Sequence, residues 1–189
     1  MSTTFQSEPR LDRPSATSHA RDEERLRALR QYGILDTDPE PAFDRVARLA
    51  AHLFDAPTAL VNLIDEDRQW FKSTVGFDED QTGLDVSFCV FTIAKGDVLV
   101  VENLAEDEAF ADNPYVTEHG ARFYAGAPLL TPHEQRIGTL CVLDTEPRSP
   151  SEDTVDRLAD LAAMVVDELE LRRERIEHEQ SRELLRQSQ

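Results

Sequence analysis

The fold is decided by residues 122–144, whose sequence is RFYAGAPLLTPHEQRIGTLCVLD. Two stretches rich in β-forming residues, Phe123–Leu130 and Ile137–Asp144, flank a polar connection at Thr131–Arg136. This pattern predicts an antiparallel hairpin whose strands are among the most buried of the domain. Because the second strand is almost continuously apolar, we expect it at the centre of the sheet.

Three residues inside this hairpin indicate unusual backbone positions. Gly126 and Pro128 lie in the first strand, and Gly138 lies near the start of the second. Glycine has no side chain to pack and proline has no N–H group to donate, so both weaken a central strand. We therefore expect a bulge here, or another group that approaches the backbone closely.

Helical signals occur at several places upstream of the hairpin. The spacing of apolar residues predicts a helix from Arg21, and Gly33 supplies its stop signal. A second helix is predicted over Pro41–Phe54, with its apolar residues on one face. Further along, Asn113 is placed to cap a helix that begins at Pro114.

Runs of β-forming residues predict three further strands, at Thr58–Ile64, Arg68–Val75 and Val98–Glu102. Trp70 and Phe71 should point to opposite faces of their strand, since neighbouring strand residues alternate. An acidic loop is predicted at Gly76–Asp85, and the apolar segment Val86–Ile93 follows it.

Together these segments resemble GAF domains, in the variety found at the front of bacterial and archaeal signalling proteins. The matching motifs are, in order, ERLRALRQYGILDTDPEPAFDRVARLAAHLFDAP, VNLIDEDRQWFKSTVG, DVSFCVFTI, LVVENLAEDEAFADNPYV, RFYAGAPLL, GTLCVLD and EPR. The resemblance covers Arg21–Arg173. It implies an α+β fold, with a GAF-like central antiparallel β-sheet, flanking α-helices on one face, pocket elements on the other and a long C-terminal helix.

One domain with a short extension at each end is expected from the length of 189 residues. Residues 1–20 are rich in Ser, Thr, Pro and charge without periodicity, which predicts a disordered tail. The GAF-like sensor domain occupies residues 21–173, and residues 174–189 form a charged helical extension. No output domain is encoded, so we expect a stand-alone regulator or one part of a larger signalling system.

A cytoplasmic location is expected from three features. No apolar run approaches the ~20 residues needed to cross a bilayer. The N-terminus lacks the apolar segment of a secretory signal. Cys89 and Cys141 lie far apart in apolar strings and do not form a disulfide framework.

The composition is strongly acidic, with a formal net charge of −18, and Lys72 and Lys95 are the only lysines. Nucleic acids and anionic membranes attract Lys/Arg surfaces, so neither is expected as a partner. The acidity is typical of a halophilic host, in which salt screens the self-repulsion of the chain. An ordinary acidic protein from an arginine-rich, lysine-poor genome would show the same composition.

The sequence predicts no enzyme and no catalytic residue. It contains no GxGxxG or GKS/GKT phosphate loop, no GxSxG elbow and no HExxH motif. Its histidines lack a second ligand at metal spacing, so we expect no metal and no cofactor. They are His19, His52, His119, His133 and His178.

Two alternatives to a non-catalytic role involve Cys89 and Cys141. A cysteine in an apolar string usually serves as a small buried hydrophobe, which is the role that we expect for both. Some proteins of this fold reduce free methionine sulfoxide through cysteines, and others attach a bilin pigment to one. The bilin binders show Cys-His, whereas Val90 and Val142 follow the cysteines here. The cysteine set of the reductases cannot be mapped onto this sequence.

By resemblance, a small-molecule pocket would lie between the sheet and its short helices. Its walls would comprise Phe88, Cys89, Thr92, Asn103, Asp112, Asn113, Tyr115, Tyr124 and Thr139. The NKFDE-type motif of the family's cyclic-nucleotide binders is absent from the sequence. The alternative is that the aromatic members fill the core, since large aromatic residues are mostly buried.

The last helix, which opens at Ser151, carries an apolar stripe that some other surface must cover. Members of the stripe lie three and four residues apart, the spacing of a coiled-coil seam, and are Leu158, Ala162, Val165 and Leu169. We expect this stripe to form a homodimer interface. The alternative is a helix that packs on its own sheet, ends near Arg172 and is followed by a fraying tail.

The expected function is that of a non-catalytic sensory domain in signal transduction. It would bind a small molecule or sense redox state, and relay the signal through the C-terminal helix to an output partner such as a histidine kinase. Two alternatives come from other classes: a small cysteine-based redox enzyme similar to the free methionine sulfoxide reductases, and a module that only dimerises.

Overall fold

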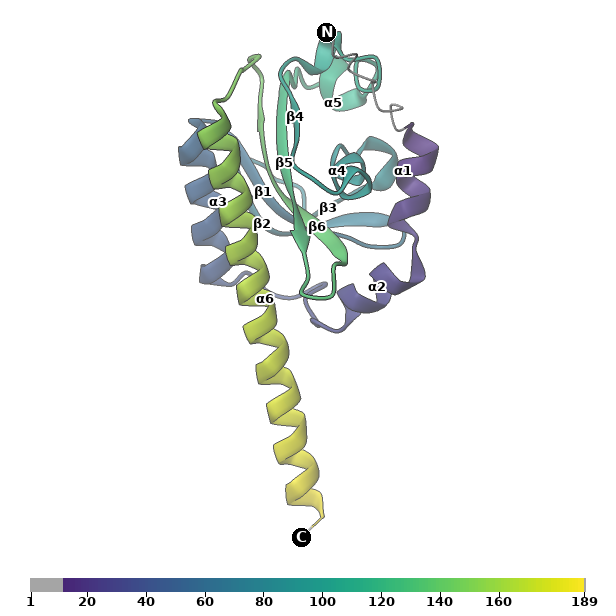
Figure 1. The fold of residues 1–189 in the computed structure, drawn as a ribbon, viewed down its shortest axis with the longest axis vertical. Helices are drawn as coiled ribbons and strands as arrows, with labels where there is room; N and C mark the ends of the chain where they lie inside the picture. Colours follow the sequence, from purple (N-terminus) through teal and green to yellow (C-terminus); the bar gives the residue numbers. More distant parts are fainter. Residues whose placement is uncertain (1–11, 189) are drawn as a thin grey trace, which may run out of the picture.

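The computed structural model describes residues 12–188 and shows a six-stranded antiparallel sheet between two layers of helices (Figure 1). The order of strands across the sheet is β3-β2-β1-β6-β5-β4. The strands are β1 Thr58–Ile64, β2 Arg68–Val75, β3 Gln81–Gly83, β4 Leu99–Val101, β5 Phe123–Leu130 and β6 Arg136–Asp144. This arrangement confirms the predicted α+β class with a central antiparallel sheet.

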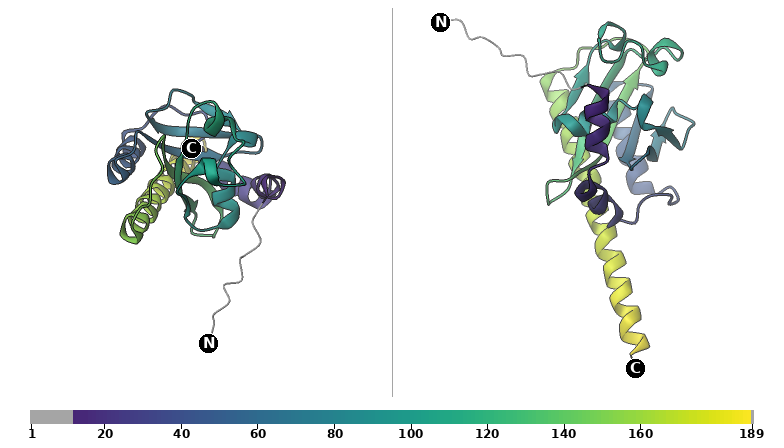
Figure 2. Two further views of the ribbon diagram at one scale, coloured as in Figure 1. Left: turned by 90° about the horizontal axis from the view of Figure 1, so that it is seen from above. Right: turned by 90° about the vertical axis from the view of Figure 1, so that its right-hand side faces the viewer.

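The helices divide between the two faces of the sheet (Figure 1 and Figure 2). Helices α3 and α6 pack together on one face, whereas α1, α4 and α5 lie on the other. The helices are α1 Arg13–Ala20, α2 Glu23–Arg30, α3 Pro41–Phe54, α4 Cys89–Lys95, α5 Pro114–Thr117 and α6 Glu152–Gln187, with 3₁₀ turns at Leu84–Val86 and Leu104–Glu106. A separate hydrophobic core therefore lies on each side of the sheet.

The predicted hairpin is formed by β5 and β6, and β6 lies between β1 and β5 at the centre of the sheet. A Cβ atom at Gly126 would overlap the hydroxyl group of Tyr124. A Cβ atom at Gly138 would overlap the carbonyl group of Asn62 in β1. Both glycines therefore mark the close approaches to the backbone that the sequence predicted.

Strand β2 contains a bulge that directs two consecutive side chains toward α3. Its pairing with β1 passes over Lys72, which is the extra residue of the bulge. Lys72 and Ser73 both bond to residues in α3 or just before it, while Phe71 packs in the core on the other face. Trp70 packs in the core beside α3, which confirms that Trp70 and Phe71 point to opposite faces.

The apolar stripe of α6 packs against the sheet of the same chain. Leu158, Ala162, Val165 and Leu169 are at most 2% exposed and lie in the core with side chains of α3, β5 and β6. The prediction that these four residues form a dimer interface is therefore wrong. An apolar stripe must be covered, but its spacing does not specify whether a sheet or a second helix covers it.

Helix α1 lies where the sequence predicted a disordered tail. Asp12 caps this helix by accepting a hydrogen bond from the N–H group of Ser15 (2.8 Å). Ala16 and Ala20 are buried beside α4, and Arg13 donates to two carbonyl groups just before α4. The prediction is therefore wrong for this helix, and the rest of the predicted tail lies outside the described residues. Small alanine side chains give little apolar periodicity, so the sequence pattern did not reveal this contact.

The segment between β2 and β4 also differs from the prediction. Strand β3 lies inside the predicted acidic loop and pairs with β2 at the edge of the sheet. The apolar segment 86–93 passes from a 3₁₀ turn into α4. The strand predicted over Val98–Glu102 is confirmed as β4, at the opposite edge.

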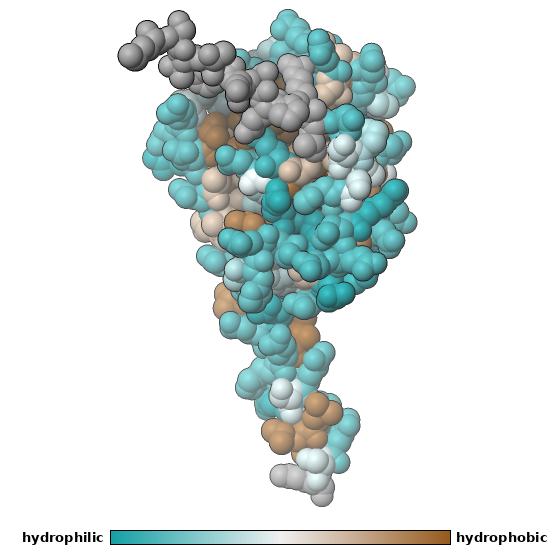
Figure 3. All heavy atoms as spheres, turned by 45° about the vertical axis from the view of Figure 1, so that its right-hand side comes forward, coloured by the Kyte–Doolittle hydropathy of each residue, from teal (hydrophilic) through white to brown (hydrophobic). Residues whose placement is uncertain are grey.

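Helix α6 continues well beyond the body of the protein (Figure 1 and Figure 2). Its 36 residues span about 54 Å at ~1.5 Å per residue, so the alternative in which it ends near Arg172 is wrong. Residues 177–188 are exposed, and Leu184 and Leu185 form an apolar patch near the end of the helix (Figure 3). Within residues 12–188, no helix is both long enough and apolar enough to span a membrane.

Candidate functional site

A cavity of about 290 Å³ lies between the sheet and the layer that contains α4 and α5. The strands contribute every second side chain to it, because neighbouring strand residues point to opposite faces. These side chains include Leu60, Phe71, Tyr124 and Cys141. The opposite wall comes from the segment before α4, α4 itself and the residues around α5, and includes Val86, Phe88, Cys89, Tyr115, His119 and Ala121.

Four of the residues predicted to form a pocket line this cavity: Phe88, Cys89, Tyr115 and Tyr124. Two more, Thr92 and Thr139, are fully buried and bonded to groups at its floor. Thr92 shares a hydrogen bond with the hydroxyl group of Tyr124 (2.7 Å), and Thr139 Oγ1 accepts one from Asn62 Nδ2 (2.9 Å).

The other three predicted residues do not line the cavity. Asn113 accepts a hydrogen bond from the N–H group of Tyr115 at the start of α5, and donates one to the carbonyl group of Val86 (3.1 Å). Asn103 caps the second 3₁₀ turn, and Asp112 is exposed. Asn and Asp favour the starts of helices and turns, and this structural use explains the two asparagines.

Aromatic rings form much of the apolar wall. The ring of Phe88 lies 5.4 Å from that of Phe110 and 5.5 Å from that of Tyr124, and the rings of Phe71 and Phe77 lie 5.3 Å apart. Such aromatic pairs stabilise one another beyond their burial. Most of these rings belong to the core and also shape the cavity, so the two predicted roles of the aromatic residues coincide.

Polar groups occur at the rim of the cavity. The hydroxyl group of Tyr115 donates to Glu79 Oε2 (2.8 Å), and the ring of Tyr115 lies 5.5 Å from that of His119. Burial and the bond to Glu79 raise the pKa of Tyr115. No sequence pattern placed Glu79 or His119 in the pocket, because both lie in irregular segments without periodicity.

Two cysteines meet at the floor of the cavity. The sulfur atoms of Cys89 and Cys141 lie 3.8 Å apart, and both cysteines are free. Cys89 Sγ accepts hydrogen bonds from Asn62 Nδ2 (3.1 Å) and from the Tyr124 hydroxyl group (3.3 Å). Asn62 is not among the predicted pocket residues, although a polar residue inside the apolar strand TALVNLI is a signal that the sequence contains.

The two thiols differ in acidity. Burial opposes ionisation of Cys89, but hydrogen bonds from Cys141, Thr139, Tyr124 and Asn62 outweigh it and lower the pKa of Cys89 to about 7. The contact with Cys89, together with burial, raises the pKa of Cys141. Cys89 is therefore the thiol that ionises first.

On the opposite face of the sheet, ion pairs connect β2 to α6. Lys72 Nζ and Arg172 Nη1 both lie 2.6 Å from Glu40 Oε2, and the side chain of Lys72 is fully buried. Burial acts to raise the pKa of Glu40, but its bonds to Lys72 and Arg172 outweigh it and lower the pKa. Arg172 also donates to the carbonyl group of Gly33 (3.2 Å), and Tyr32 donates to Glu170, so the loop after α2 holds α6 at this point.

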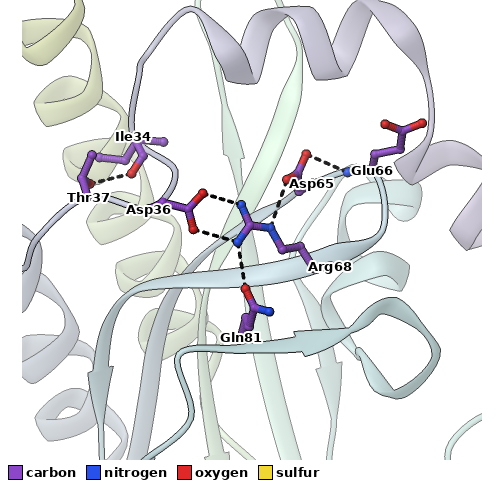
Figure 4. Close-up of polar contacts among 7 residues, drawn as sticks. All are labelled: Ile34, Asp36, Thr37, Asp65, Glu66, Arg68 and Gln81. Carbon is purple, nitrogen blue, oxygen red and sulfur yellow. Dashed lines mark hydrogen bonds and ion pairs between the residues drawn. The ribbon is translucent and has the colours of Figure 1, made fainter.

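The same loop is bonded to β2 a second time through Arg68 (Figure 4). The guanidinium group of Arg68 forms two hydrogen bonds with the carboxylate of Asp36, both 2.8 Å long. It also donates to Asp65 (3.2 Å) and to Gln81 of β3 (2.8 Å). Arg68 of β2 therefore joins the loop before α3 to the turn between β1 and β2 and to the edge strand β3.

The fold, the cavity on one face and the protruding helix on the other define a sensor-type domain. The chain belongs to the GAF family, because the model of the GAF domain matches residues 38–169. GAF domains are typical of signalling proteins, and the resemblance found in the sequence is confirmed. Among residues 12–188, no group of three or more His, Cys, Asp or Glu side chains could hold a metal ion.

Three relatives illustrate the range of proteins that this chain resembles. It is 40% identical over 138 residues to a cyclic di-GMP phosphodiesterase from Pseudomonas aeruginosa, a match that covers 72% of this chain and 24% of the relative. The chain therefore spans about a quarter of the length of that curated relative.

Two solved structures share the fold. The GAF domain of an Acinetobacter phosphoenolpyruvate-protein phosphotransferase has a TM-score of 0.59 and 19% identity, covering 78% of this chain and 93% of that one. The free methionine-R-sulfoxide reductase from Neisseria meningitidis, in complex with its substrate, has a TM-score of 0.59 and 17% identity, covering 86% and 88%. At these identities both structures show the fold alone.

Proposed function

We propose that this protein is a non-catalytic sensory GAF domain that binds a small molecule in the cavity and relays binding through α6. The observation that carries the proposal is the cavity of about 290 Å³, which is apolar and aromatic with a few polar groups at its rim and floor. Ligand pockets have this composition, and their volumes begin at about 300 Å³. The site favours a compact, mostly apolar molecule that makes one or two hydrogen bonds.

Strand β2 supplies the route from the cavity to α6. Gln69 and Phe71 line the cavity, and the next residue, Lys72, points to the opposite face because neighbouring strand residues alternate. Lys72 is paired with Glu40, which also holds Arg172 of α6. A ligand that displaces Phe71 therefore acts on a strand that is bonded to α6 through a single carboxylate. Such coupling requires that the ligand bind one arrangement of these contacts better than the other.

The test is mass spectrometry of the native protein, purified without denaturation. A bound small molecule should appear with the wild type and with Ala109→Phe, an exposed position outside the cavity, and should be lost from Ala121→Phe, which fills the rim. Thermal-shift screening of compact apolar compounds should raise the melting temperature of the first two proteins only. The proposal fails if the wild type carries no molecule and no compound raises its melting temperature more than it raises that of Ala121→Phe.

The homodimer and the output partner are further parts of this proposal. Met164, Leu171 and Leu185 are roughly half to two-thirds exposed and lie seven or fourteen residues apart on α6, so they follow one stripe of the helix. This stripe, rather than the buried one, is the surface that we propose for pairing with a second copy or with a partner such as a histidine kinase. Leu171→Glu should convert a dimer to a monomer in light scattering, and a wild type that is already monomeric would contradict the pairing.

A further inference from the structure

We infer that Cys89 and Cys141 form a redox site at the floor of the cavity, where an organic hydroperoxide oxidises the two thiols to a disulfide. The inference shares the cavity with the proposed function, and requires only that a small molecule can enter it. Peroxide reduction differs from sulfoxide reduction and from bilin attachment, the two cysteine reactions that the resemblance brought into consideration.

The geometry places the two sulfur atoms within reach of each other. They are 52 residues apart in sequence, yet Sγ–Sγ is 3.8 Å, and both residues line the cavity. A disulfide has a sulfur–sulfur distance of about 2.05 Å, so the sulfur atoms must approach by about 1.8 Å. Cys89 is the first residue of α4, a short helix that contacts the sheet through packed side chains and a few side-chain hydrogen bonds but pairs with no strand. It can therefore move by this amount more readily than Cys141, which lies in the central strand β6.

The neighbouring polar groups make the two cysteines unequal. Asn62 Nδ2 and the Tyr124 hydroxyl group both donate to Cys89 Sγ, whereas Asn62 lies 3.8 Å from Cys141 Sγ. Donors directed at a sulfur atom stabilise its thiolate form. The thiolate is the nucleophile in peroxide chemistry, and the lowered pKa of Cys89 agrees with this assignment. Cys89 is therefore the attacking residue, and Cys141 is the residue that resolves the intermediate.

The reaction balances in two steps. The thiolate of Cys89 attacks the terminal oxygen of the hydroperoxide, a sulfur–oxygen bond forms, the oxygen–oxygen bond breaks, and the alkoxide leaves as the alcohol after it takes up a proton. The sulfur of Cys141 then attacks the sulfenic acid on Cys89. The disulfide forms, the sulfur–oxygen bond breaks, and water leaves with the proton of the Cys141 thiol. Two thiols are oxidised by two electrons, and one peroxide is reduced to an alcohol and water.

The test treats the reduced protein with tert-butyl hydroperoxide and follows the free thiols and the intact mass. The thiol count should fall from two to none, with loss of the mass of two hydrogen atoms, and dithiothreitol should restore both. Cys141→Ser should stop at a sulfenic acid on Cys89, which dimedone traps. Cys89→Ser should not react, and Cys89→Ala serves where the serine variant does not fold. The rate in wild type should rise with pH as the Cys89 thiol ionises, and should reach half of its maximum at a pH of about 7.

Either of two results would overturn the inference. One is a wild type that keeps both thiols under conditions in which free cysteine is fully oxidised. The other is a Cys89→Ser or Cys89→Ala protein that consumes peroxide as fast as the wild type. The ligand test of the proposed function is carried out on reduced protein and on Cys141→Ser, so loss of peroxide reactivity and loss of ligand binding are separate outcomes.

Discussion

Replacing Glu40 with Gln should lower the free energy of unfolding by about 2–3 kcal/mol. Glu40 neutralises Lys72, whose side chain is fully buried. Removing one partner of a buried ion pair costs about 3–5 kcal/mol, because the other charge stays uncompensated. Lys72 Nζ retains hydrogen bonds to Thr37 Oγ1 (2.8 Å) and to the carbonyl group of Asp38 (2.5 Å), and the Glu40 side chain is 29% exposed. Both facts place the expected loss below the usual range.

The assay is urea unfolding at pH 7, with Glu66→Gln as the matched control. Glu66 pairs with Arg30 at 3.8 Å, and both side chains are more than half exposed, so this control should lose less than about 0.5 kcal/mol. The double variant Glu40→Gln/Lys72→Met should recover most of the stability, since an apolar side chain replaces the buried charge. Equal, small losses for the Glu40 and Glu66 variants would refute the claim that the pair at Lys72 is buried and holds β2 to the loop before α3.

Four further outcomes are expected. The lowered pKa of Glu40 means that its contribution to stability is complete above its ordinary value of 4.5 and is lost as the pH falls below it, so Glu40→Gln should flatten the decline in urea stability at acid pH. Gly126→Ala should displace Tyr124 and lower the free energy of unfolding by about 1–3 kcal/mol, against about 1 kcal/mol for Gly120→Ala, which has open space but a positive φ. Leu169→Glu should abolish cooperative unfolding in circular dichroism, because it places a charge in the core. The melting temperature should rise steadily from low salt to ~1 M chloride, and an unchanged value would contradict an adaptation of the −18 charge to salt.

The sheet could be predicted from the sequence because the patterns that indicate its strands lie within short stretches of the chain. Alternation placed Trp70 and Phe71 on opposite faces, and the run of β-forming residues located the hairpin and its central strand. The stripe of α6 was found for the same reason. What covers the stripe depends on elements far away in sequence, and spacing alone does not distinguish a sheet from a second helix.

The site was predicted only in part, for a related reason. Phe88, Cys89, Tyr115 and Tyr124 were placed in a pocket by resemblance, and the structure brings them together. The proximity of Cys89 to Cys141 depends on how α4 packs over β6, which no local pattern encodes. Ser73 points to the same face as Lys72 because of a bulge, and the sequence has no Gly or Pro at either position to indicate one.

The protruding part of α6 has the geometry of a lever arm. The loop after α2 contacts the helix from Glu170 to Ile176, and residues 177–187 then extend without contact to the rest of the described chain. These eleven residues measure about 16 Å at ~1.5 Å per residue. A tilt of about 10° at the contact with the loop would move the tip by about 3 Å over that length. A partner that holds the tip would therefore experience a larger displacement than the helix undergoes beside the loop, without the helix having to bend.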